Sequence, residues 1–153
     1  MAHFARVDKN NIVQSIHVVD NENLLNEHGK EEEDFGIVHL NKIHGVGFTW
    51  VQTSYNNNFR KQYAGMGYVY NASKNKFLNP QPYASWALDG SDDWKAPITY
   101  PSTTSGSGFV YSITWNETKY NADNDTGWQA TKSNDDAETP TVYNWNGSAW
   151  VSE

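Results

Sequence analysis

The side chains best suited to metal or acid–base chemistry in this sequence are its histidines, and their spacing favours neither. They are His3, His17, His28, His39 and His44. His39 and His44 are five residues apart, and the HExxH motif of zinc hydrolases is absent. The chain also has no cysteine, which excludes disulfides, thiolate metal sites and a cysteine nucleophile. We therefore expect no bound metal and interpret the histidines as structural or surface residues.

Two acidic loops resemble the opening of a calcium-binding loop. Asp123-Asn124-Asp125-Thr126-Gly127 has the alternating acidic pattern, and Asp89-Gly90-Ser91-Asp92-Asp93 has it more faintly. Neither loop supplies the later bidentate glutamate that completes such a site. We interpret both as solvated turns.

The remaining chemical motifs are incomplete. The glycine pairs in Gly65-Met66-Gly67 and Gly106-Ser107-Gly108 do not extend to a dinucleotide-binding or phosphate-binding loop, and no GxSxG elbow is present. Nothing singles out a catalytic carboxylate pair among the eighteen acidic residues. Four N-x-S/T sequons are interpreted as chance in a chain rich in Asn, Ser and Thr: they begin at Asn71, Asn116, Asn124 and Asn146. We expect no enzymatic activity, no catalytic residue and no cofactor.

Aromatic residues are the feature that rises above background. They make up 14% of the chain and include seven tryptophans. Exposed rings of this kind can form a platform on which sugar faces stack. Trp and Tyr are also enriched in hairpin cores and protein interfaces, and this second interpretation is favoured. Seven tryptophans exceed what a small core needs, so we expect some of them to meet a partner.

The composition predicts a mainly β fold, β-sandwich-like or hairpin-rich, with one short helical segment near residues 20–45. Leucine, on which helical cores depend, is scarce, whereas aromatic residues, Val and Thr suit a pleated surface. Asn, Asp, Gly and Ser recur every few residues, as in the turns between short strands. Leucine occurs only at Leu24, Leu25, Leu40, Leu78 and Leu88.

Residues 3–19 are typical of a hairpin around the turn 8–11. Its second arm has apolar residues on both faces, so we expect this arm to be central in its sheet. Helix is predicted in two pieces, first near Leu24 and then after the acidic run 31–34, whose charge favours a helix N-terminus. Gly36 weakens the second helix. Strands are expected from Trp50 to Tyr55 and again near residues 67–70.

A recurring pattern of aromatic, polar turn and aromatic predicts further hairpins with an aromatic on each arm. In the last of them, a turn at Gly147-Ser148 places Trp145 opposite Trp150, whereas a turn at Asn146-Gly147 places Tyr143 there instead. The sequence leaves both registers open. The four hairpins are Tyr70…Phe77, Trp86…Trp94, Trp115…Tyr120 and Trp145…Trp150.

Two units are expected along the chain. Pro97, Pro101 and the Ser/Thr/Gly run 102–108 have the composition of a hinge. On this basis residues 1–100 form a β-rich N-terminal unit that contains the helical segment. Residues 109–153 form a C-terminal unit of aromatic hairpins.

The net charge of −7 and pI near 5.1 favour neither nucleic acid nor anionic membrane as a partner. The opening residues 1–8 have no apolar stretch of the signal-peptide type, and no apolar run is long enough to span a membrane. We expect a protein made and assembled in a cytoplasm.

Three segments, in order along the chain, resemble a family of small proteins encoded by marine bacteriophages, especially cyanophages. The first is Met1-Ala2-His3-Phe4-Ala5, and the last is Pro80-Gln81-Pro82-Tyr83-Ala84-Ser85-Trp86. Between them lies the longest, residues 50–68, which reads WVQTSYNNNFRKQYAGMGY. The resemblance covers about residues 1–100.

The resemblance implies a virion-associated structural protein, either a capsid-surface decoration (knob) or a tail or fibre accessory. It brings no catalytic motif. The leading expectation is therefore a decoration protein on the capsid exterior, assembled in the host bacterial cytoplasm. Its expected partners are the major capsid protein or other virion structural proteins. The alternative is a tail or fibre module that binds a glycan or receptor of the host surface.

Overall fold

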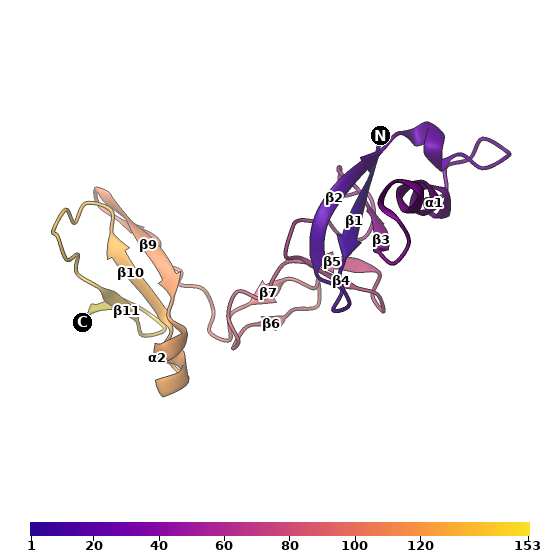
Figure 1. Cartoon of the computed structure of the whole chain (residues 1–153). Coiled ribbons are helices and arrows are strands. Elements are labelled where there is room, and N and C mark those ends of the chain that lie inside the picture. The colour runs from indigo at the N-terminus through magenta and orange to yellow at the C-terminus, as the bar shows by residue number, and fades with distance from the viewer. The chain divides into compact units, whose positions relative to one another are not determined.

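The boundary between two structural units lies after Pro80 in the computed structural model, which describes all residues from Met1 to Glu153 (Figure 1). Unit 1 is Met1–Pro80 and unit 2 is Gln81–Glu153. The sequence had placed the hinge later, at 101–108. Residues 81–100 belong to unit 2 because Trp86 and Ile98 pack into the aromatic core around Trp115.

Unit 1 is built on an antiparallel sheet of three strands in the order β2-β1-β3. The predicted hairpin is present: β1 (Ala2–Val7) and β2 (Val13–Val19) flank a turn in which the Asp8 carboxylate accepts the Asn10 and Ile12 backbone N–H groups. The expectation that the second arm is central is wrong, because β1 lies between β2 and β3 (Thr49–Thr53). Beyond its pairing with β1, the start of the β2 arm meets residues 67–69 through an isolated bridge from Ile12 to Val69 and through backbone hydrogen bonds of Val13 with Gly67 and Tyr68.

Both faces of β1 are buried because adjacent residues enter two different cores. Phe4 packs with Leu24, Leu40 and Trp50 under the helical segment. Ala5 packs with Phe77 and other residues on the opposite face. The hairpin of β4 (Val69–Asn71) and β5 (Lys76–Leu78) covers that face. The alternation of side chains along a strand thus gives unit 1 a layer on each side of its sheet.

Helix is found where the sequence predicted it, as the 3-10 turn η1 (Asn21–Leu24) and the helix α1 (Glu33–His44). Gly36 lies in the middle of α1 and is buried. A side chain at this position would overlap the ring of Phe4, which is itself fully buried. Glycine therefore lets the helix approach β1 closely, although it is a poor helix former.

The outer edge of β3 is closed by two side chains instead of a fourth strand. The Gln52 backbone N–H donates to Glu33 Oε1 (2.6 Å), and the Gln52 carbonyl accepts from Arg60 Nη1 (2.6 Å). Arg60 also forms a two-pronged ion pair with Glu33, with N···O distances of 2.8 and 2.9 Å. The pair supplies the donor and acceptor that a neighbouring strand would supply.

Unit 2 holds an antiparallel sheet of five strands in the order β12-β11-β10-β9-β8, and a separate two-stranded hairpin, β6–β7. Its central tryptophans, Trp115, Trp128 and Trp145, are all buried. With this sheet the chain as a whole is mainly β, as predicted. The elements of unit 2 are β6 (Ala87–Leu88), β7 (Trp94–Lys95), β8 (Ser105–Gly106), β9 (Phe109–Trp115), α2 (Glu117–Ala122), β10 (Trp128–Lys132), β11 (Tyr143–Trp145) and β12 (Trp150–Ser152).

Two of the four predicted aromatic hairpins have the expected cross-strand pair. Tyr70 lies opposite Phe77, and Trp145 lies opposite Trp150, which settles the register of the last hairpin in favour of the Gly147-Ser148 turn. The hairpin β6–β7 exists, but Trp94 pairs with Leu88 and not with Trp86.

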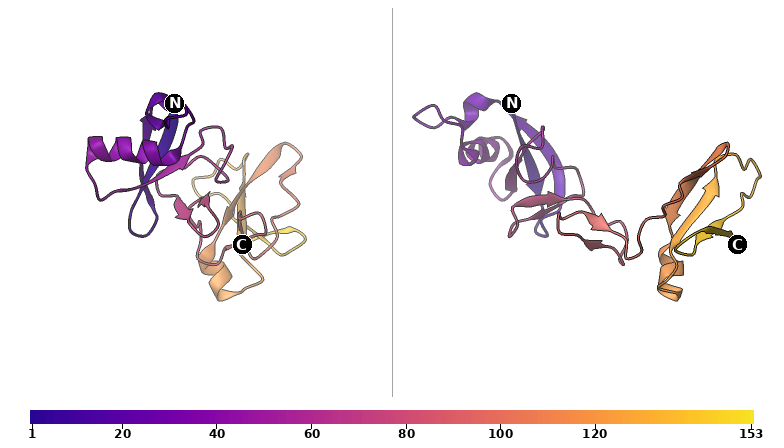
Figure 2. Two further views of the ribbon diagram at one scale, coloured as in Figure 1. Left: turned by 90° about the vertical axis from the view of Figure 1, so that its right-hand side faces the viewer. Right: turned by 180° about the vertical axis from the view of Figure 1, so that it is seen from behind.

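The predicted hairpin between Trp115 and Tyr120 is wrong, because β9 runs directly into helix α2 (Figure 2). Asn116 caps this helix: its side chain accepts the backbone N–H of Lys119 at 3.0 Å. Asparagine is a strong N-cap residue. The two rings still meet, with their centroids 5.3 Å apart, across a helical turn.

Replacing Trp150 with alanine is expected to loosen the terminal hairpin and leave unit 1 unchanged. The Trp150 ring lies 5.2 Å from Trp145 and 5.1 Å from Tyr111, and its indole N–H donates to the Thr103 carbonyl at 2.7 Å. Losing these contacts should lower the protection of the β11 and β12 amides by about 2 kcal/mol or more in hydrogen exchange. Val151→Thr, on the exposed side of the same strand, is the control. Unchanged protection in Trp150→Ala would contradict the pairing.

Candidate functional site

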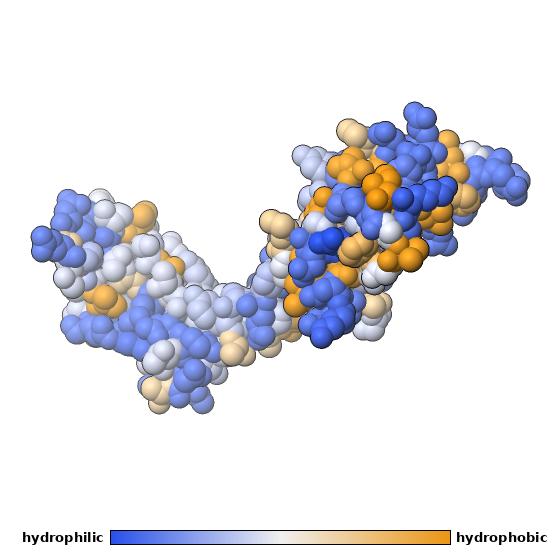
Figure 3. Space-filling model, viewed as in Figure 1, coloured by the Kyte–Doolittle hydropathy of each residue, from blue (hydrophilic) through white to orange (hydrophobic).

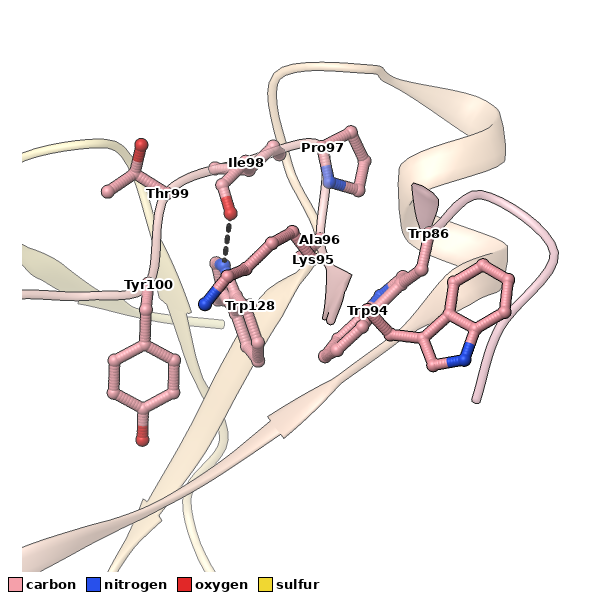
Figure 4. Close-up of a pocket in the computed structure, with 9 residues that line it drawn as sticks. All are labelled: Trp86, Trp94, Lys95, Ala96, Pro97, Ile98, Thr99, Tyr100 and Trp128. Carbon is pink, nitrogen blue, oxygen red and sulfur yellow. Dashed lines mark hydrogen bonds between the residues drawn. The ribbon is translucent and has the colours of Figure 1, made fainter. Parts of the chain in front are cut away.

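An aromatic cleft in unit 2 encloses a volume of about 590 Å³. It contains three tryptophan rings, a tyrosine and a lysine, and no carboxylate (Figure 4). We call it the aromatic cleft. Its lining residues are Trp86, Trp94, Lys95, Ala96, Pro97, Ile98, Thr99, Tyr100 and Trp128.

The cleft is positioned by residues that are distant in sequence. Trp128, at the start of β10, is only 6% exposed, and its indole N–H donates to the Ile98 carbonyl at 3.0 Å. This bond fixes the extended segment 96–100 beside the sheet. Tyr100 follows on that segment, its ring edge-to-face with Trp128 at 5.0 Å. Trp86 approaches Trp128 at 6.0 Å, so that Figure 4 shows the Trp128 ring between those of Tyr100 and Trp86.

Few polar groups face the aromatic cleft. The donor of Trp128 is already used, and Trp86 Nε1 is buried without a hydrogen-bond partner. Lys95 Nζ lies 3.9 Å from Asp89 Oδ2. The cleft therefore offers mainly ring surface for contact, with the Thr99 hydroxyl and one paired charge, Lys95, as the polar side-chain groups of its lining beside the indoles and the Tyr100 hydroxyl.

A carboxylate that contacts this aromatic core, Glu117, has a structural role. Glu117 accepts three hydrogen bonds, from the Ser85 backbone N–H (2.8 Å), the Ser85 hydroxyl (2.7 Å) and Trp115 Nε1 (2.8 Å). These donors lower the pKa of Glu117 below its ordinary value of 4.5. The residue ties the segment before β6 to the N-terminus of α2 and so supports the wall that carries Trp86.

A second candidate surface lies on unit 1, where apolar side chains of α1 and the following loop are exposed. Val46 is 87% exposed and Ile43 is 62% exposed. In the view of Figure 3, hydrophobic residues reach the surface of this unit in several places, whereas unit 2 is mainly hydrophilic. We call this set the apolar patch. Its residues are Phe35, Val38, Ile43, Val46 and Phe48.

The sequence pointed to the aromatic residues as a class but did not select either surface. In α1, Leu40 is buried and Ile37 packs against the same core. Ile43 on the same helix is exposed. Apolar residues at 35, 38 and 43 alternate along the chain with the helix residues that face the core. This pattern is the signal that could have revealed a helix that is apolar on both sides.

No family model, curated protein or solved structure matches this chain. No helix is long and apolar enough to cross a membrane, and no three His, Cys, Asp or Glu side chains are grouped so as to hold a metal ion.

The two acidic loops are turns closed by their first residue: Asp89 accepts the backbone N–H groups of Ser91 and Asp93, and Asp123 accepts that of Asp125. The two candidate surfaces are therefore argued from geometry and charge.

All five histidines lie in unit 1, and two of them meet there. The ring centroids of His17 and His44 are 4.7 Å apart, and His17 lies 4.9 Å from Trp50. Burial, followed by the nearby charges of His44 and Arg6, lowers the pKa of His17 below its ordinary 6.5. His17 thus prefers to be neutral in the folded unit.

Acidification is expected to destabilise unit 1 at a higher pH than unit 2. Because the pKa of His17 is lowered in the folded state, the unfolded chain takes up the proton first. The stability that neutral His17 contributes is fully present above about pH 6.5. It is lost as the pH falls towards the pKa of His17 in the folded state. In unit 2 the pKa of Glu117 is also lowered, so the stability that this residue contributes is likewise lost as the pH falls, but only below about pH 4.5.

Urea unfolding followed by the indole NMR signal of Trp50, the one tryptophan of unit 1, measures this effect at about pH 7.5 and about pH 5.5. His17→Gln should reduce the difference between the two conditions, and the remainder should come from His3, whose pKa is also lowered by burial. An equal pH effect in that variant would contradict the assignment to His17.

Proposed function

We propose that this chain is a structural protein of a bacteriophage virion, a decoration (knob) on the outer surface of the capsid. The proposal rests on one observation, the separation of exposed apolar surface from net charge between the two units. Residues 1–80 contain eight acidic and eight basic residues, whereas residues 81–153 contain ten acidic and three basic ones. Unit 1 is thus neutral and carries the apolar patch, while unit 2 carries the whole net charge of −7.

This division suits attachment through unit 1. The centres of protein interfaces are depleted of charged residues and enriched in aromatic and other large apolar side chains. The apolar patch has this composition. Unit 1, which carries the patch, has no net charge that would repel a partner. The partner we propose is the major capsid protein or another virion structural protein, which also agrees with the resemblance of residues 1–100 to small phage proteins.

The charge of unit 2 favours the capsid exterior. Packaged DNA repels a module with a net charge of −7, so a position inside the capsid is disfavoured. Long fibres need heptads or repeats to form trimers, and the sequence has neither. A solvated acidic unit on a particle surface meets no such conflict.

A second candidate function is a tail or fibre accessory module that binds a glycan or receptor of the host. The aromatic cleft is the observation that favours it, since exposed rings on an accessory protein would meet the host surface. An accessory module of this size needs no heptads.

Mass spectrometry of purified particles, before and after removal of the tails, decides between the two positions. A decoration protein stays with the tail-less capsids at high copy number. Loss of the protein with the tails, at low copy number, would replace the capsid proposal by the tail alternative.

The attachment surface can be tested on the same particles. Val46→Asp is expected to reduce incorporation about tenfold or more, because it places an unpaired charge at the most exposed residue of the apolar patch. Met66→Asp is the matched control, since Met66 is 76% exposed in unit 1 but lies outside the apolar patch. Equal incorporation of both variants would contradict attachment through the patch.

A further inference from the structure

We infer that the aromatic cleft of unit 2 is a binding site for a neutral oligosaccharide built of hexopyranose rings. The inference extends the second candidate function by naming a ligand class, but it requires no particular position on the virion. It concerns binding by the isolated protein and is therefore tested separately from location.

The size and surface of the cleft fit such a ligand. A volume of about 590 Å³ lies within the range of about 300–1,000 Å³ that is usual for small-molecule sites. Tyr100 is 55% exposed, and the half-buried Trp94 and Trp86 share the lining with it. The C–H faces of a hexopyranose pack on rings of this kind without requiring a charged partner. The rings come from several segments, so more than one sugar unit can be held.

Charge selects a neutral ligand. An anionic polysaccharide approaches a unit with ten acidic and three basic residues and is repelled. A cation would suit the net charge, but Lys95 lines the cleft and places a positive group beside the rings. The Lys95 side chain is 67% exposed, and its 3.9 Å ion pair with Asp89 compensates its charge only in part. A ligand without charge meets neither penalty.

The hydrogen-bonding groups disfavour a peptide. A proline-rich segment also docks on aromatic grooves, but its carbonyls lack internal partners and need donors when they are buried. Here the indole N–H of Trp128 is taken by Ile98, and that of Trp86 is buried within the core. Two of the three indole donors in the lining are therefore not presented to a peptide backbone at the surface of the cleft.

The full chain, labelled with ¹⁵N, is titrated with maltopentaose, cellopentaose, chitopentaose and mannopentaose, each at millimolar concentration. The seven indole N–H signals are assigned by single Trp→Phe variants. At least one of these sugars should shift the signals of Trp86, Trp94 and Trp128, while the signal of Trp50 in unit 1 stays in place. A charged oligogalacturonate and a proline decapeptide are titrated in parallel.

Tyr100→Ala is expected to weaken the binding of the sugar that shifts the cleft signals by about tenfold. This is the loss of affinity that removal of one stacking contact causes. Tyr55→Ala is the matched control, because Tyr55 is an exposed tyrosine of unit 1. Trp94→Ala gives an independent second variant on the cleft. The inference is overturned if no neutral sugar shifts the cleft signals. It is also overturned if the charged sugar or the peptide alone shifts them, or if Tyr100→Ala and Trp94→Ala both bind as the wild type does.

Discussion

Replacing Arg60 with methionine is expected to lower the stability of unit 1 by about 3 kcal/mol. The Arg60 side chain is 14% exposed and that of its partner Glu33 is 29% exposed, so both charges are largely removed from water. Removing the arginine leaves the Glu33 carboxylate without its cation and the Gln52 carbonyl without its donor. Arg60 also has a left-handed backbone, with φ of 57°, which an L-residue adopts only where its contacts compensate the cost.

Urea unfolding of the full chain, monitored at Trp50, measures this loss, and Lys9→Met in the exposed turn before β2 is the control. A double-mutant cycle with Glu33→Gln should show a coupling of about 1–3 kcal/mol. The β3 edge is left without its cap in Arg60→Met, so we also expect this variant to associate at high concentration. A stability within about 0.5 kcal/mol of the wild type would contradict the role of the pair.

Gly36→Ala is expected to destabilise unit 1 by about 2 kcal/mol, even though alanine is the better helix former by about 1 kcal/mol. A methyl group at this position overlaps the Phe4 ring, and Phe4 has no exposed surface into which it could move. Overpacking of a closed core therefore outweighs the gain in helix propensity. The opposite sign would result if the helix could simply shift away from β1.

A second substitution can show whether Gly36→Ala is destabilising because of overpacking against Phe4 or because of a general defect. Phe4→Leu shortens the side chain beneath the helix, so Gly36→Ala should cost less in that background than in the wild type. Lys42→Ala on the exposed side of α1 is the control and should change stability by no more than about 0.5 kcal/mol. An equal cost of Gly36→Ala in both backgrounds would show that the clash is not with Phe4.

Features that depend on neighbouring residues were predicted well from the sequence. The first hairpin follows from apolar arms around the Asp8 turn, and the last hairpin follows from a short turn between two aromatic arms, although the structure was needed to choose its register. In each case the turn residues and the strands they join are adjacent along the chain. The mainly β composition indicated the fold class for the same local reason.

Features that depend on distant contacts were not predicted. Glu33 and Arg60 are separated by 27 positions, and neither has a pattern that identifies its partner. The unit boundary was misplaced because the bond from Trp128 to Ile98 joins segments 30 residues apart, and the prolines near residue 100 suggested a break instead. The aromatic cleft depends on the same bond, so the sequence could name its tryptophans but could not assemble them.

The unequal charge of the two units has a consequence for the physical behaviour of the chain as a colloid. A neutral body with exposed apolar groups tends to precipitate, whereas a strongly charged one stays dispersed. Residues 1–80 have no net charge and carry the apolar patch, while residues 81–153 have a surplus of seven negative charges. Unit 2 therefore acts as a covalently attached solubilising partner for unit 1. It keeps unit 1, with its exposed apolar patch, dispersed in solution.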